Sequence, residues 1–219
     1  KFFSEAKAYY QEKTHTANNL KFEAVRGLFD GQQKLFVRAQ EVKQMLLAVD
    51  LAKTFGFQLV LVGASESFQI ADFLAANKVQ VILDNEHSLP ATEDDDVDQP
   101  YKTPAALQKA GVVFALNDNH DQSRFRNLAF NAGTAATYGL DKEQALTAIT
   151  LNTAKVLGIE SVTGSLEIGK DANILIANGD ALDMRGNVFT KAFIQGRDVS
   201  LDNKHKQLYE RFKYKYGIQ

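Results

Sequence analysis

Ionisable side chains follow directly after short apolar runs of this sequence, and their types suit hydrolytic chemistry. One run ends at Arg38, another ends at Asp84, and a third is followed by Asp118 and His120. Carboxylates and imidazoles bind divalent metals and transfer protons, and a guanidinium can supply positive charge in place of a metal. These residues form a candidate site if the fold brings the ends of the runs together.

The apolar runs and the segments between them predict alternating strands and helices. Strands are expected at 34–37, 58–62, 79–83 and 112–116, and helices at 1–30, 41–55, 65–76, 104–110, 124–138 and 142–157. Near-continuous apolar strands separated by amphipathic helices indicate an α/β fold with a parallel sheet. Because an eight-stranded barrel needs about 250 residues, four such units fit half of one. A small open α/β sheet is the alternative.

The composition is that of a folded globular chain, and it excludes some classes of site. The chain has 219 residues, of which 45% are hydrophobic, and a net charge of −2, so we expect neither nucleic acid nor a membrane surface as a partner. It has no cysteine, which excludes disulfides and thiolate metal sites. It begins at Lys1 in a helical pattern, and we expect it to be part of a longer protein. The sequence does not assign a compartment.

The pattern changes after Gly158, where strand-like runs and glycine turns replace the alternation of strands and helices. Short runs at 165–168, 174–177 and 189–194 indicate a small β unit, and 203–216 is expected to be a helix. Within the β unit, Gly164 begins the string G-S-L-E-I-G-K-D-A-N-I-L-I, which follows a helix ending in Leu157-Gly158. This combination resembles the C-terminal signature of the amidohydrolase superfamily, and most closely its imidazolonepropionase-like branch.

The resemblance implies a fold and a domain organisation. It implies the C-terminal half of a TIM-type (β/α)8 barrel, strands five to eight, followed by part of a small β-sandwich. We therefore expect a half barrel at 1–158, the C-terminal piece of the sandwich at 159–200 and a closing helix at 201–219. It also implies metal-assisted hydrolysis of non-peptide C–N bonds, of the cyclic-amide type.

The family's metal ligands are mostly changed in this chain. Where members have Val-His-Ala-His at the end of the fifth strand, this chain has Val-Arg-Ala-Gln, residues 37–40. Where they have Glu-His-Gly on the sixth strand, it has Val62-Gly63-Ala64. Asp118 alone matches, at the place of the Asp that binds metal and takes a proton from the attacking water. Zinc is the metal expected of an intact site, with further ligands upstream, but we expect none bound to this chain.

Several roles stay open for the remaining candidates. Arg38 is expected to pair with Asp118 across the site, or else to face solvent, and Asp118 is otherwise a turn residue. His87 and His120 are candidate substrate-binding residues with Arg38. They are either exposed loop histidines or, with Asp84, Asp118 and Asp121, a relocated metal site. The irregular segment 86–104, with its acidic run at 93–96, is a solvated loop or a lid over the barrel mouth.

Two functions fit these observations. The first is a hydrolase of cyclic amides whose metal-ligand positions are degenerate in this half. The second is a catalytically silent amidohydrolase-fold module that serves as a structural or regulatory partner of an active paralogue. In either case a half barrel leaves two strand edges unpaired. We therefore expect it to pair with its own N-terminal half or with another copy, and a small-molecule substrate is possible.

Overall fold

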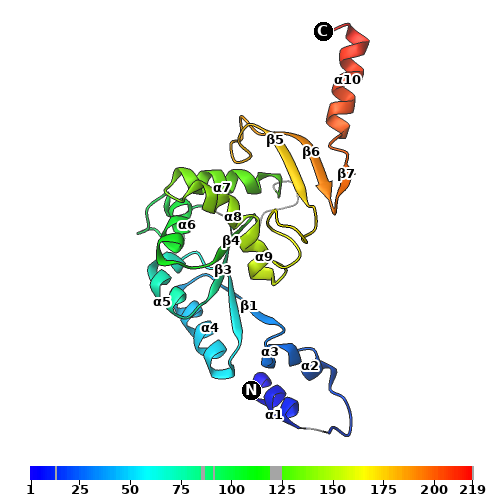
Figure 1. Cartoon of the computed structure of the whole chain (residues 1–219). Helices are drawn as coiled ribbons and strands as arrows, with labels where there is room; N and C mark the ends of the chain where they lie inside the picture. The colour runs from blue at the N-terminus through cyan, green and yellow to red at the C-terminus, as the bar shows by residue number, and fades with distance from the viewer. Residues whose placement is uncertain (13, 85–86, 91, 119–124, 219) are drawn as a thin grey trace.

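The chain folds around a four-stranded parallel sheet. The computed structural model describes residues 1–12, 14–84, 87–90, 92–118 and 125–218. The strands lie side by side in sequence order and are β1 (Lys34–Ala39), β2 (Gln58–Gly63), β3 (Gln80–Asp84) and β4 (Phe114–Asn117). Figure 1 shows the sheet curving through the centre of the molecule. The predicted α/β class and half-barrel arrangement are confirmed.

Helices in the crossovers cover one face of the sheet and bury the main core. They are α4 (Val42–Phe55), the 3-10 turn η1 (Ser67–Ile70), α5 (Ala71–Ala76) and α6 (Gln99–Ala110), then η2 (Phe125–Asn127), α7 (Leu128–Thr137) and α8 (Lys142–Ala148). Met45, Leu61, Leu74 and Leu107 are fully buried between these layers. The alternating side chains Leu59 and Leu61 of β2 point toward this core.

A single helix, α9 (Leu151–Leu157), packs on the opposite face of the sheet. Its Val156 is buried against Val60 and Ala115, which alternate with the core residues of their strands. The ammonium of Lys34, at the start of β1, donates to the carbonyls of Lys155 and Val156 at 2.5 and 3.1 Å. Burial lowers the pKa of Lys34 below its usual range. Helix α9 therefore closes the amino end of what would be the barrel interior.

Three predicted helices were wrong in their bounds. The helix expected at 1–30 is three shorter helices, at 2–11, 20–23 and 26–29. Helix α6 begins at Gln99 rather than at Pro104, because proline is tolerated in a first turn and Lys102 pairs with Asp98 at 2.7 Å. The helix expected at 142–157 is broken at Thr150, whose φ and ψ of −130° and −95° are not helical. These differences lie outside the sheet and leave the order of the strands unchanged.

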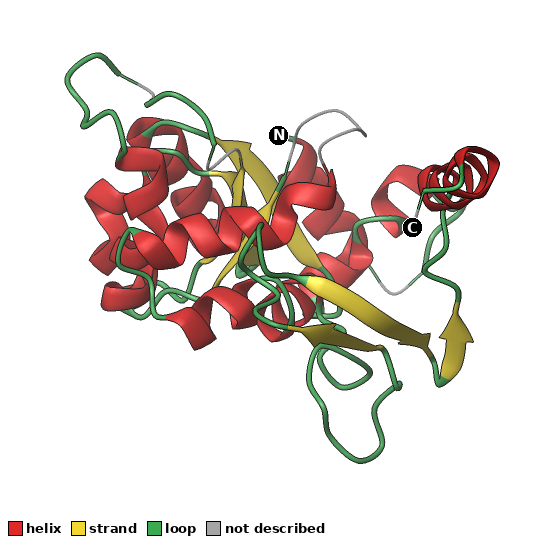
Figure 2. Ribbon diagram, turned by 90° about the horizontal axis from the view of Figure 1, so that it is seen from above, coloured by secondary structure: helices red, strands yellow, loops and turns green. Residues whose placement is uncertain are grey.

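The β unit after Gly158 is a separate antiparallel sheet. It contains β5 (Ile174–Asn178), β6 (Val188–Ile194) and β7 (Arg197–Val199), in that order, while the predicted run at 165–168 forms turns (Figure 2). Gln195 and Gly196 join β6 to β7 with φ angles of 50° and 75°, as a tight hairpin turn requires. Leu175 and Ile194 remain 65% and 59% exposed, so the sheet has apolar surface still to cover.

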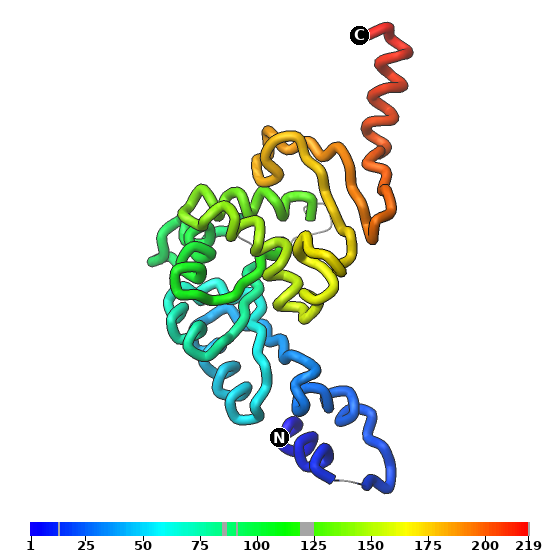
Figure 3. Tube along the Cα trace, in the orientation of Figure 1, coloured from blue at the N-terminus to red at the C-terminus, as the bar shows by residue number. Residues whose placement is uncertain are grey.

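The two ends of the chain carry further helices (Figure 3). At one end α1 (Phe2–Gln11), α2 (Leu20–Glu23) and α3 (Arg26–Phe29) pack through aromatic side chains, such as Phe3 and Phe29, onto Phe57. At the other end α10 (Lys204–Tyr216) follows β7. In the described part of the chain, no helix combines the length and apolar content needed to cross a bilayer.

Candidate functional site

Three polar residues lie at the carboxyl ends of three strands, on the same face of the sheet. Arg38 ends β1 on the face that carries Val60, because β1 and β2 pair Arg38 with Val62. By the same alternation Asp84 of β3 and Asn117 of β4, which are register partners, share that face. We call Arg38, Asp84 and Asn117 the strand-end network. Its place is where barrel enzymes hold their reacting groups.

The strand-end network is centred on the carboxylate of Asp84. Arg38 Nη1 donates to Asp84 Oδ2 at 2.7 Å, reaching across β2, and Asn117 Nδ2 donates to Asp84 Oδ1 at 2.7 Å. The Asp84 side chain is 1% exposed, whereas that of Arg38 is 58% exposed. A buried carboxylate needs such partners, because burial without them is costly. The ion pair predicted between Arg38 and Asp118 is therefore made with Asp84 instead.

Gln40 fills the space beside Gly63. Its side-chain amide lies where a Cβ on Gly63 would stand, so no larger residue fits there without movement. Gln40 Oε1 also accepts from the backbone N–H of Ser65 at 3.3 Å, and the Ser65 hydroxyl donates to the Gln40 carbonyl at 3.2 Å. Gly63 and Ala64 have φ angles of 96° and 51°. The end of β2 is therefore fixed by backbone geometry and by Gln40.

The other predicted site residues are dispersed. Asp118 follows β4 and is 4% exposed. His87 is exposed, and its Nε2 lies 2.8 Å from the Thr134 hydroxyl oxygen on α7. Because that hydroxyl donates to the Phe130 carbonyl, its oxygen accepts a hydrogen from His87. His120 and Asp121 lie outside the described residues. The substrate-binding roles of Arg38, His87 and His120 stay predictions.

The residues described at the strand ends do not fit a divalent metal. Among the described residues, no group of three His, Asp or Glu side chains is placed to hold one. At the three positions where the resemblance predicts histidine, Arg38 offers only donors, Gly63 has no side chain, and the amide oxygen of Gln40 accepts from the Ser65 N–H. Of the carboxylates, Asp84 already accepts from Arg38 and Asn117. Asp118 stays the only residue of this half that the resemblance predicts as a metal ligand, and one ligand is too few for zinc.

A cavity lies between the strand ends and the acidic loop. Its volume is about 190 Å³, and its walls include Gln40, Ser65 and Asp84 from the strand ends and Ser88, Asp95 and Gln99 from the loop side. Asp96 and Asp98 of the loop pair with Lys102 on α6 at 3.0 and 2.7 Å. The described part of the loop thus lies beside the strand ends, and its role as a lid stays a prediction.

The strand-end network was not predicted from the sequence. Asp84 was expected only as a metal ligand, Asn117 had no expected role, and Gln40 was noted only as a changed ligand position. The alternation of side chains along β3 and β4 was the available signal, since it places Asp84 and Asn117 on the face of Arg38.

The comparison with known proteins gives a family and a set of similar structures. The sequence profile of the amidohydrolase family matches residues 91–200. The crystal structure of an amidohydrolase from Thermotoga maritima MSB8 is similar, with a TM-score of 0.79 and 28% identity, over 91% of this chain and 54% of that one. The search of curated proteins returned no match.

More distant structures share the fold alone. An adenosine deaminase from Xanthomonas campestris with bound zinc has a TM-score of 0.60 and 19% identity, over 99% of this chain and 61% of that one. A Xaa-Pro dipeptidase with bound methionine has a TM-score of 0.59 and 18% identity, over 81% of this chain and 47% of that one. The chain thus spans about half the length of the solved structures that it matches.

Proposed function

This chain belongs to the amidohydrolase family, and from that premise we propose that it forms the second half of the barrel of a hydrolase. We infer that the bond broken is a non-peptide C–N bond of the cyclic-amide type. The family profile and the likeness to the Thermotoga maritima amidohydrolase support this proposal. Because the chain spans 54% of that protein, the reaction belongs to the whole protein rather than to this half alone.

Arg38 and Asp118 are the residues that we propose for the chemistry of this half. The observation that carries the proposal is the 2.7 Å ion pair between Arg38 and Asp84, which fixes a guanidinium at the strand ends. There the guanidinium stabilises the negative charge that develops on the substrate's carbonyl oxygen. Asp118 accepts a proton from the attacking water as the C–O bond forms, and the proton passes to the leaving nitrogen as the C–N bond breaks.

A second function, a catalytically silent module, is favoured by how completely the strand-end polar groups satisfy one another. Both oxygens of Asp84 accept hydrogen bonds from within the strand-end network, and Gln40 occupies the space beside Gly63. A site arranged in this way is stable without a substrate. On this alternative the half barrel pairs with an active partner and regulates or supports it.

Hydrolysis of cyclic amides by the full natural polypeptide distinguishes the two functions. With hydantoin and related cyclic amides, Arg38→Gln and Asp118→Asn should each lower kcat/KM by about 100-fold or more. Arg26→Gln and Asp72→Asn make the same charge changes at exposed sites away from the strand ends and should leave kcat/KM unchanged. A folded wild-type protein that opens none of these rings would contradict the hydrolase and favour the silent module.

A further inference from the structure

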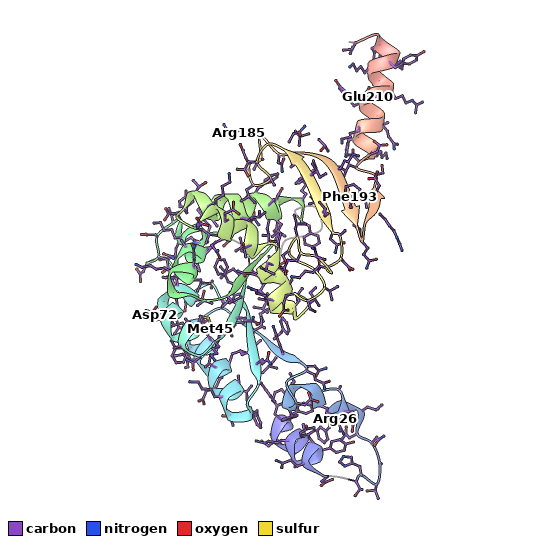
Figure 4. The ribbon with its side chains drawn as sticks, in the orientation of Figure 1. Arg26, Met45, Asp72, Arg185, Phe193 and Glu210 are labelled. Carbon is purple, nitrogen blue, oxygen red and sulfur yellow. The ribbon has the colours of Figure 1, made fainter. Side chains whose placement is uncertain are left out.

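Helix α10 stands apart from the rest of the molecule. Figure 4 shows its side chains, with Glu210 labelled, projecting into space that no other element fills. None of its residues is buried, and within the described chain its hydrogen bonds stay between residues 201 and 218. An isolated helix of 13 residues is marginal in water, because nucleating a helix is costly. We therefore expect α10 to be stabilised by binding a surface that the described part of this chain does not provide.

The charge of α10 is opposite to that of the rest of the chain. The helix contains five cationic residues and a single acidic one, Glu210, so it carries a net charge of +4. The whole chain carries −2, which leaves −6 on the remaining residues. The near-neutral total therefore hides a separation of charge. The expectation of no membrane partner rested on that total and not on where the charges lie.

The apolar residues of α10 form one stripe along the helix. Leu208, Tyr209, Phe212 and Tyr216 recur at the spacing of a single helical face. Tyr209, Phe212 and Tyr216 are 63%, 47% and 64% exposed, and the rings of Phe212 and Tyr216 stack with centroids 6.2 Å apart. His205 interrupts this face in the first turn. Tyr214, which is 92% exposed, lies on the opposite face.

Cationic side chains border the stripe on both sides. At 3.6 residues per turn, one side carries Lys204, Arg211 and Lys215, and the other carries Lys206 and Lys213. The Lys215 ammonium lies 5.1 Å from the centroid of the Tyr216 ring, so the charges sit close beside the aromatic residues. Low overall hydrophobicity with an aromatic stripe between two cationic borders is the pattern of a helix lying in a membrane interface.

We propose that α10 binds the surface of an anionic lipid bilayer. The stripe enters the boundary between headgroups and acyl chains, and the two rows of cations contact anionic headgroups. A flat negative surface accounts for cations on both borders, whereas a groove on a protein would have to carry matching acidic residues along both of its sides. Because α10 projects away from the sheet in Figures 1 and 3, it can lie on a bilayer while the acidic remainder stays clear.

Co-sedimentation of the full natural polypeptide with vesicles tests the charge requirement. The protein should pellet with phosphatidylcholine vesicles that contain about 30 mol% phosphatidylserine, and not with pure phosphatidylcholine. Lys213→Gln with Lys215→Gln should weaken binding by about 30-fold, because each cation near the surface contributes about fivefold. Lys43→Gln with Lys109→Gln makes the same charge change on exposed residues of α4 and α6 and should leave binding unchanged.

A second pair of variants tests the stripe. Tyr209→Ala with Phe212→Ala should weaken vesicle binding by about tenfold or more, whereas Tyr214→Ala on the opposite face should leave it within about twofold. Circular dichroism should show all variants folded, because these side chains make no contact with the core. The proposal fails if no anionic vesicle binds the protein, or if Tyr214→Ala has the effect of the stripe variant.

The competing occupant is the acidic loop of a second copy, residues 93–98. Sedimentation velocity without lipid separates the two possibilities. Self-association that high salt abolishes, and that Lys213→Gln with Lys215→Gln also abolishes, would assign α10 to that loop and overturn the lipid proposal. If these substitutions leave the sedimentation coefficient unchanged, the acidic loop does not bind α10, and the result agrees with the lipid proposal.

Discussion

The side-chain amide of Gln40 occupies the position beside Gly63 where a Cβ would stand. Gly63 also has a φ of 96°, in a region that residues with a side chain rarely adopt. A residue larger than glycine at position 63 and the present placement of Gln40 therefore exclude each other. Two of the positions where the resemblance predicts histidine, 40 and 63, are therefore coupled in space, and a histidine at position 63 requires Gln40 to move.

Replacing Gly63 with alanine should destabilise the fold for two separable reasons. Gly63→Ala places a methyl group against Gln40 and in an unfavourable backbone region, at a combined cost of about 2–3 kcal/mol. Gly56→Ala is the matched control, because Gly56 has a φ of 77° with nothing within 4 Å of an added Cβ. Urea unfolding should give about 1 kcal/mol less destabilisation for the control.

A double variant tests the contact with Gln40 directly. Adding Gln40→Ala to Gly63→Ala should restore the part of the free energy of unfolding by which Gly63→Ala is worse than Gly56→Ala. The added methyl group then no longer meets the Gln40 amide. A double variant whose free energy of unfolding equals the sum of the two single effects would show that Gln40 does not press on Gly63.

Removing the guanidinium of Arg38 should destabilise the strand ends. Arg38→Gln leaves the buried carboxylate of Asp84 with one fewer charged partner, and we expect a loss of about 1–3 kcal/mol in urea unfolding. Arg26→Gln removes an exposed pair with Glu23, at 2.8 Å, and should cost less than about 1 kcal/mol. Equal losses in the two variants would mean that Arg38 is an ordinary surface residue.

The sequence predicted the frame of the site better than its contacts. Residues 58–62 and 79–83 are continuous apolar runs, and such runs form central parallel strands whatever their neighbours are. The choice of Asp84 over Asp118 as the partner of Arg38 depends on strand register and on the face that each residue takes. Two carboxylates at the ends of adjacent strands are equivalent in a sequence until that register is known.

The limits of two helices were also beyond the sequence pattern. Prolines at 100 and 104 and the acidic run before them indicated a loop, yet Lys102 pairs with Asp96 and Asp98 and helix α6 starts at Gln99. Thr150 lies within a continuous helical pattern, yet its backbone is not helical, and its hydroxyl donates to the Leu146 carbonyl at 2.7 Å.

Acid should weaken the junction between the half barrel and the small β-sheet. Lys142 on α8 donates to the carboxylate of Asp180, which follows β5, at 2.5 Å. This hydrogen bond and a second one from the Leu182 N–H lower the pKa of Asp180. Because the pKa of Asp180 is lower in the folded than in the unfolded protein, its ionised carboxylate stabilises the fold. This stabilisation is fully present above the pKa of the unfolded state, near pH 4, and is lost as the pH falls through the pKa of the folded state. Limited proteolysis around residues 179–187 should therefore speed up below about pH 4.

Asp180→Asn checks the origin of that acid sensitivity. The variant should be cleaved faster than wild type at neutral pH, with little further change in acid, because asparagine does not titrate. Asp72→Asn changes an exposed carboxylate on α5 and should keep the wild-type profile. An unchanged acid response in Asp180→Asn would assign the effect to another group.

Among the described strands, β1 and β4 each have one edge without a partner, and these edges should drive association. Phe36 of β1 is 45% exposed on the face that a closed barrel would cover. Sedimentation velocity of the 219-residue chain should show species larger than a monomer, and Phe36→Lys should reduce them. Leu47→Lys changes a residue of α4 that is 72% exposed and should not. A monodisperse monomer would contradict pairing through these edges.

The most direct test of the central claim, that the strand ends of this half hold no metal, is whether zinc binds through Asp118. Elemental mass spectrometry would count zinc per chain in the full natural polypeptide and in Asp118→Asn, after equilibration with zinc and dialysis. We predict the same zinc content in both, because the described residues place no group of three His, Asp or Glu side chains to hold a metal, and Arg38, Gln40 and Gly63 stand where the resemblance predicts histidines. One equivalent of zinc in the wild type that is lost in Asp118→Asn would contradict that prediction and show a metal site built on this half of the barrel.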